Sequence, residues 1–85
     1  MKVVAIKWQD ATTICEWSSI KEAEKGCFQT CYACGLLIAN TKKIVTVALL
    51  LSEDKKTISN WINIPARDVL EFKVIGEIEW EDKDV

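Results

Sequence analysis

Residues 33–51 read ACGLLIANTKKIVTVALLL, which is two apolar runs on either side of the polar break NTKK at 40–43. An asparagine and solvated lysines are typical of a tight connection, and each flanking run has the length of a strand. Periodicity alone cannot separate such runs from a single buried helix, but the β-branched residues of 44–47 favour strands. The stretch therefore predicts a buried β-hairpin, whose strands we place at residues 27–39 and 44–51.

Three more runs that alternate between apolar and polar residues follow the hairpin. Residues 58–64 form the first, which ends at Pro65 because proline has no N–H to donate to a neighbouring strand. Residues 69–75 form the second and have the most regular alternation in the chain. After Gly76, residues 77–81 place carboxylates outward, which predicts a C-terminal edge strand.

The N-terminal run at residues 3–8 also alternates, with Val4, Ile6 and Trp8 on one side, and it predicts a first strand. Gly35 interrupts the long run at 27–39. A glycine within a strand pattern often marks a bulge or a sharp bend. We therefore expect one long bent strand there, or two strands with a kink.

The start and stop signals of a short helix lie between these two runs. Ser18 or Ser19 offers an N-cap, and Glu22 lies three residues after Ser19, in the position of a capping box. Gly26 is a natural stop. The predicted helix covers residues 20–25. Its expected inward-facing side chains are Trp17, Ile20 and Ala23.

Length and composition describe one folded domain, which we assign to residues 1–85. Apolar residues make up 49% of the chain and charged residues 28%, as in folded rather than disordered proteins. At this size, stabilisation by association is common, so we expect an oligomer or a tight partner. The net charge of −2 argues against binding to duplex DNA through its phosphate backbone.

The order of the expected strands from residue 28 to 75 resembles the small five-stranded barrel of the Sm-like (LSm) superfamily, an SH3-like fold. The segments Gly35-Leu36-Leu37-Ile38 and Ile62-Asn63-Ile64-Pro65 are similar to short bacterial and phage-type Sm-like proteins. The expected fold is therefore mainly β: a five-stranded Sm-like/SH3-like barrel with an extra N-terminal strand, one short helix and a C-terminal edge strand. The resemblance also implies homo-oligomers that form through edge strands, which would cover the open edges of such a sheet.

RNA binding is the known activity of many Sm-like proteins. Those proteins carry an aspartate-containing base-stacking loop and a basic residue beside a glycine in the last hairpin. Residues 40–43 and 65–68 of this chain reproduce neither pattern. Binding of single-stranded RNA is therefore kept as an alternative and is not assigned to particular residues.

Catalysis has few candidate residues. The chain has no histidine, which removes the commonest general base and the Ser-His and Cys-His nucleophile pairs. Carboxylates gather near the C-terminus, where their alternation favours a solvated face. We therefore expect no enzyme activity, no catalytic residues and no cofactor.

Cys27, Cys31 and Cys34 have the CxxxCxxC spacing with which radical-SAM enzymes hold an iron–sulfur cluster. Those enzymes have a much larger fold, and Ala33 stands where an aromatic residue usually precedes the last cysteine. A zinc site with Cys15 as the fourth ligand is the stronger metal alternative. If Cys31 and Cys34 share a strand, however, they point to opposite faces. Buried structural cysteines and no metal are the expected case.

The N-terminal apolar run is broken by Lys7 after four residues, which is too short for the core of a signal peptide or for a membrane span. The expected compartment is the cytoplasm, or the host cytoplasm if the protein is encoded by a phage. The cysteines would be reduced there, and no membrane partner is expected.

Candidate binding residues surround Trp61, because a tryptophan among small polar groups on the outward side of a strand marks a contact surface or a lid over a second apolar layer. Its ring can stack on a base, while amides and basic groups hold polar edges or a phosphate. The predicted ligand-binding residues are Asn60, Trp61, Asn63, Arg67, Lys42 and Lys43. The alternative is that Trp61 packs under the helix or at a subunit interface. Trp8, Trp17 and Trp80 are expected in the core or in an interface.

These features together predict a non-enzymatic, homo-oligomeric protein that binds or sequesters a nucleotide-type ligand. A phage anti-defence protein that acts on a host signalling nucleotide is one form of this function. The alternatives are an adaptor or inhibitor that docks on a partner protein, a single-stranded RNA binder, and a zinc-stabilised module.

Overall fold

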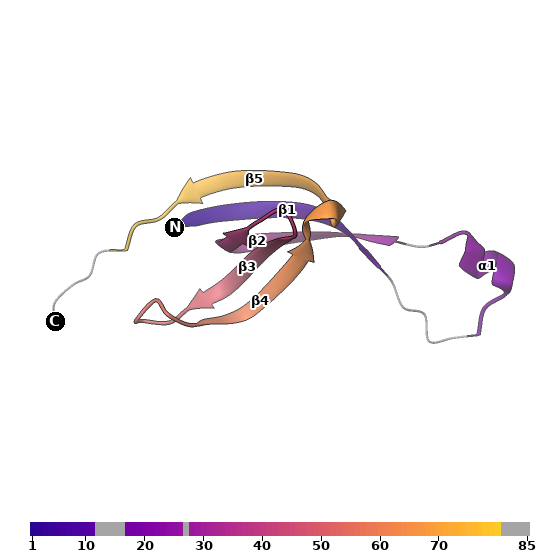
Figure 1. The fold of residues 1–85 in the computed structure, drawn as a ribbon, viewed down its shortest axis with the longest axis horizontal. Coiled ribbons are helices and arrows are strands. Elements are labelled where there is room, and N and C mark those ends of the chain that lie inside the picture. The colour runs from indigo at the N-terminus through magenta and orange to yellow at the C-terminus, as the bar shows by residue number, and fades with distance from the viewer. Residues whose placement is uncertain (12–16, 27, 81–85) are drawn as a thin grey trace.

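The computed structural model describes residues 1–11, 17–26 and 28–80 of the chain. In this part, five antiparallel strands form one sheet (Figure 1). The elements in chain order are β1 (Lys2–Ala11), the helix α1 (Ile20–Glu24), β2 (Phe28–Asn40), β3 (Ile44–Leu51), β4 (Ile58–Pro65), the 3-10 helix η1 (Ala66–Asp68) and β5 (Val69–Glu77). The strands lie in the order β4-β3-β2-β1-β5, so β2 is in the middle and β4 and β5 are the edges.

The mainly β prediction is confirmed, but the sheet does not close into a barrel. Closure would require β4 and β5 to pair, and these strands lie at opposite edges of the sheet. Figure 1 shows the cause, because β3 and β4 diverge from β1 and β5. The N-terminal strand was expected as an addition to a five-stranded unit, and it is instead one of the five, placed between β2 and β5.

The prediction of a separate C-terminal strand at residues 77–81 is wrong for residues 77–80, which the structure describes. β5 runs through Gly76, which pairs with Val3 of β1, and ends at Glu77. The N–H of Ile78 then donates to the carbonyl of Met1, and the N-terminal ammonium donates to the carbonyl of Ile78, both at 2.8 Å. Gly76 does not break the strand because β1 continues beside it.

The alternation of β1 places one face of the sheet in the core. Val4, Ile6 and Trp8 are 0%, 2% and 8% exposed, as their spacing predicts. Ile6 lies between Ala33 of β2 and Phe72 of β5 in the register of the sheet. Full burial of such a side chain contributes about 1.5–3 kcal/mol, so β1 anchors this half of the molecule.

The same face continues across the other half of the sheet. Val45 and Val47 of β3 are buried, and Val45 pairs with the buried Ile64 of β4. Leu37 of β2 pairs with Val47 and packs against this cluster. We call this side, which carries Ile6, Val47 and Ile64, the core face, and the opposite side the outer face.

Gly35 lies where β3 passes close to β2. A Cβ atom at this position would be 2.7 Å from the carbonyl oxygen of Ala48 and 2.8 Å from Cγ1 of Val47. The irregularity that the glycine led us to expect lies further on, where the register with β3 shifts between Leu37 and Ala39. Gly35 therefore marks a close approach of two strands, and the bulge is next to it.

The β2–β3 turn confirms the predicted hairpin. The hydroxyl oxygen of Thr41 accepts hydrogen bonds from the N–H groups of Lys43 at 3.2 Å and Ile44 at 3.1 Å. The N–H of Thr41 donates to the carbonyl of Ile44 at 2.9 Å. A short polar side chain thus satisfies the backbone of the tight turn, which is why such residues favour turns.

α1 starts at the predicted residue, after the N-cap Ser19, and ends at Glu24, one residue before the predicted end, but it does not have the predicted burial. The hydroxyl oxygen of Ser19 accepts from the N–H of Glu22 at 3.1 Å, and Gly26 follows with φ of 68°. Trp17 and Ile20, expected to face inward, are 104% and 78% exposed. The helix lies beyond the ends of β1 and β2, away from the sheet, so the core is out of its reach (Figure 1).

The molecule is elongated, with extents of 62 × 23 × 19 Å. Its radius of gyration is 17.1 Å, whereas a compact domain of this length has about 12 Å. Its accessible surface is 7223 Å², whereas a folded monomer of 9.6 kDa has about 5,100 Å². The open sheet and the outlying α1 therefore leave uncovered a surface that a compact domain of this mass would bury.

Candidate functional site

Trp61 lies on the outer face in a row of apolar residues that crosses four strands. It pairs with Ala48 of β3, which pairs with Leu36 of β2, which in turn pairs with Val3 of β1. Ala48 is buried between its neighbours, while Trp61 at the end of the row is half exposed. Trp61 is not packed under α1, which lies at the other end of the molecule (Figure 1).

The two predicted asparagines on β4 have different surroundings. The side-chain carbonyl oxygen of Asn63 accepts a hydrogen bond from the hydroxyl of Thr46, its cross-strand partner. This bond gives the buried Thr46 a partner and leaves the Asn63 amide N–H₂ group for other contacts. Asn60 has φ of 52°, in the left-handed region, where asparagine is among the more tolerant residues.

The predicted basic residues lie at another place, where the β2–β3 turn meets η1. The N–H of Ala66 donates to the carbonyl of Lys43 at 2.9 Å, which joins the two segments. Nε of Arg67 lies 3.9 Å from Oδ1 of Asp68, with the guanidinium group largely exposed. Trp61 is four residues from Pro65 along β4, or about 13 Å at the rise of a strand. The fold therefore brings Arg67, Lys42 and Lys43 to one end of the sheet, separate from Trp61.

A depression of about 530 Å³ lies on the outer face over the three strands β2, β1 and β5. The side chains on that face that line it are Ala5, Lys7, Tyr32, Cys34, Glu71 and Lys73. Lys7 pairs with Tyr32 on one side and Glu71 on the other, and Ala5 pairs with Cys34 and Lys73 in the same way. Two adjacent cross-strand rows thus build the depression, with Ala5 as its smallest side chain.

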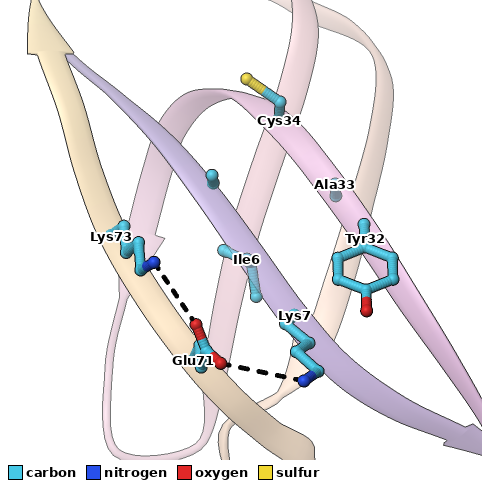
Figure 2. A pocket seen from close by; sticks show the side chains of 8 residues that line it. Ile6, Lys7, Tyr32, Ala33, Cys34, Glu71 and Lys73 are labelled. Carbon is cyan, nitrogen blue, oxygen red and sulfur yellow. Dashed lines mark ion pairs between the residues drawn. The ribbon is translucent and has the colours of Figure 1, made fainter.

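Glu71 lies between the two lysines, as Figure 2 shows. Its Oε1 is 3.8 Å from Nζ of Lys7, and its Oε2 is 3.6 Å from Nζ of Lys73. Both pairs are solvated, and exposed ion pairs of this kind contribute only about 0–1 kcal/mol. The cluster carries one positive charge in excess, so an anion can compete with Glu71 for the two ammonium groups.

Tyr32 supplies an aromatic ring at the same place. Its side chain is 75% exposed and lies beside Lys7 in the register of the sheet (Figure 2). An exposed ring next to two cationic groups can stack on a planar ligand whose anionic part the lysines hold. None of the six residues predicted from the sequence lines this depression.

This cluster could not be found from sequence spacing. Lys7, Tyr32 and Lys73 lie in three different strands, and only the placement of β1 between β2 and β5 brings them together. The one local signal was the alternation of residues 3–8, which puts Lys7 on the side opposite Ile6. Its neighbours on that side depend on which strands pair.

Cys31 and Cys34 both lie in β2 and occupy opposite faces. Cys31 pairs with Trp8 and packs against the core, whereas Cys34 pairs with Ala5 and is exposed on the outer face. Cys15 and Cys27, which the zinc alternative needs, lie outside the described residues. Across residues 1–11, 17–26 and 28–80, no three cysteine or acidic side chains gather in a way that suits a metal ion.

Comparison of the chain with protein-family models, curated proteins and solved structures gave no match. Within the described part of the chain, no helix has the length and apolar character needed to cross a membrane.

Proposed function

We propose that the protein is a non-enzymatic, self-associating binding protein for a nucleotide-type ligand. The ligand lies in the depression of the outer face, with its phosphate between Lys7 and Lys73 and its base on the ring of Tyr32. The observation that supports this proposal is the presence of two ammonium groups and an exposed ring around a small residue, Ala5 (Figure 2).

The balance of charge favours an anionic ligand at this place. The chain as a whole has a net charge of −2, yet the depression has two lysines and one carboxylate. Hydrogen bonds between an ammonium group and a phosphate are among the stronger ones in proteins. Stacking of a base on an aromatic side chain adds about 1–3 kcal/mol. The two contacts together suit a nucleotide better than either an inorganic anion or a neutral nucleoside.

Calorimetric titration with ATP, GTP and a cyclic dinucleotide tests the proposal. For the nucleotide that binds, Lys73→Gln should raise the dissociation constant about tenfold, because it removes one charged hydrogen bond worth about 1.5 kcal/mol. Lys56→Gln removes the same charge from the exposed β3–β4 turn and serves as the control. Absence of binding to all three nucleotides contradicts the proposal.

Replacing Glu71, which competes with the ligand for the two ammonium groups, should strengthen binding. Glu71→Gln frees both ammonium groups and should lower the dissociation constant about two- to fivefold, which corresponds to an exposed ion pair of up to about 1 kcal/mol. The same titration measures it. Arg67→Gln and Trp61→Leu test the site predicted from the sequence, and weaker binding in these two variants with no effect of Lys73→Gln would move the ligand to that site.

A further inference from the structure

The two edges of the sheet differ in how they are protected from pairing with other chains. β5 carries charged side chains at Glu71, Lys73 and Glu77, and its register with β1 is irregular at two places. Charges and bulges are the features with which natural edge strands avoid association. β4 reads ISNWINIP and has no charged residue. The protective features of β4 are Asn60, with φ of 52°, and Pro65, and the segment between them, residues 61–64, has no charge.

The part of the sheet next to this edge has exposed apolar side chains on both faces. Adjacent residues of a strand point to opposite faces. Trp61 and Ile62 are adjacent on β4 and are 53% and 40% exposed, and Leu49 and Leu50 are adjacent on β3 and are 63% and 51% exposed. A strand pair in contact with water usually has one polar face. β3 and β4 instead have the composition of a strand pair inside a larger assembly.

The regular part of the β4 edge is short and well defined. Its pairing with β3 is continuous from Trp61 to Pro65, opposite residues 44–48. Asn60, with φ of 52°, interrupts the strand on one side, and Pro65 ends it on the other because it has no N–H to donate. The backbone groups available for a new partner are therefore those within residues 61–64 that point away from β3, which belong to alternate residues.

We infer that a second copy of this chain occupies the β4 edge, with the two β4 strands antiparallel about a twofold axis near Ile62 and Asn63. This inference deepens the self-association contained in the proposed function. A twofold contact brings the same surface of each copy together. With no charged residue in β4, no like charges face each other across the axis.

The exposed apolar side chains next to the β4 edge supply area for such a contact. The whole chain, with the outlying α1 included, exposes about 2,100 Å² more than a folded monomer of the same mass. A stable dimer needs about 800 Å² from each partner. Pairing at β4 would cover parts of Trp61, Ile62 and the neighbouring leucines in both copies, which are the exposed apolar side chains of β3 and β4.

Sedimentation velocity on the full chain tests this interface. The wild type should sediment as a species of twice the chain mass of 9.6 kDa. Ile62→Lys places two ammonium groups near the axis and should raise the dimer dissociation constant at least a hundredfold. Leu70→Lys is the matched control, because it puts the same charge in place of an exposed aliphatic residue on the other edge strand, and it should remain a dimer.

Hydrogen exchange on the wild type gives a second reading that does not depend on a variant's folding. Within residues 61–64, the amides that point away from β3 should exchange more slowly as concentration rises through the dimer range, while those of β5 should not change. A monomer at all concentrations overturns the inference and would leave this surface to a different protein partner. Dissociation by Leu70→Lys alone, or a larger ring broken by both variants, also overturns it.

The same samples separate this inference from the proposed function. The depression lies on β1, β2 and β5, whereas Ile62 lies on the opposite edge strand. A monomeric Ile62→Lys variant should therefore bind nucleotide at the depression as the wild type does. A dimer that binds no nucleotide would contradict the proposed ligand but not the β4 interface. A monomer that binds nucleotide would contradict the β4 interface but not the proposed ligand.

Discussion

Gly35 has no side chain at the point where β3 passes beside β2, and this allows the two halves of the sheet to meet. Gly35→Ala would put a Cβ atom 2.7 Å from a backbone oxygen and 2.8 Å from a β-branched side chain, so the backbone must shift. We expect a loss of about 1–3 kcal/mol in the free energy of unfolding, measured by urea denaturation. Gly76→Ala is the control, because nothing lies within 4 Å of its added methyl group. Equal losses in the two variants would contradict this explanation.

Asp54 is the residue whose protonation the β3–β4 turn controls. The hydroxyl of Ser52 donates to its carboxylate, and the N–H of Lys56 donates at 3.0 Å, and these bonds lower the pKa of Asp54 from its ordinary value of 3.8. A lowered pKa means that the turn is stabilised above pH 3.8 and loses this contribution as the pH falls through the lower folded value.

Ser52→Ala should therefore raise the pKa of Asp54 toward 3.8, because it removes the largest of the causes that lower it. An NMR titration of the side-chain carboxyl carbon between pH 2 and pH 6 measures the change. An unchanged pKa would show that the Ser52 hydroxyl does not stabilise the carboxylate and that the backbone N–H groups do so without it.

At the scale of elements, α1 has a good cap but no tertiary packing in the described structure. All of its residues are exposed, and a helix of five residues is marginal by itself. Ile20→Ala should change the free energy of unfolding by less than about 0.5 kcal/mol. Ile6→Ala in β1 removes a core side chain and should cost about 2–5 kcal/mol. Urea denaturation compares them, and a large loss in Ile20→Ala would show that α1 packs against a surface.

The elements also show what the sequence can predict and what it cannot. The β2–β3 hairpin and the start of α1 were predicted correctly because the signals are local: the polar break at 40–43, and an N-cap at Ser19. The prediction that one face of α1 is buried was wrong, because burial depends on what lies near the helix. The continuation of β5 through Gly76 was missed because the reason is its partner in β1.

The whole molecule was the least predictable, because it depends on pairings between distant strands. The alternation of β1 identified its buried face correctly but gave no sign that β5 would be its neighbour. The depression with Lys7, Tyr32 and Lys73 exists only because of that arrangement. The prediction of a closed barrel was wrong, since β4 and β5 lie at opposite edges of the sheet and the accessible surface is 7223 Å².

The position of β1 between β2 and β5 also has a consequence during synthesis. β1 leaves the ribosome before the other strands, and β5 leaves after them, so one edge of β1 stays without its partner while most of the domain is made. Contacts between segments so distant in sequence are slow to form. Nascent chains therefore keep this edge of β1 unpaired until β5 arrives, and Val69 and Phe72 join the core in a late step.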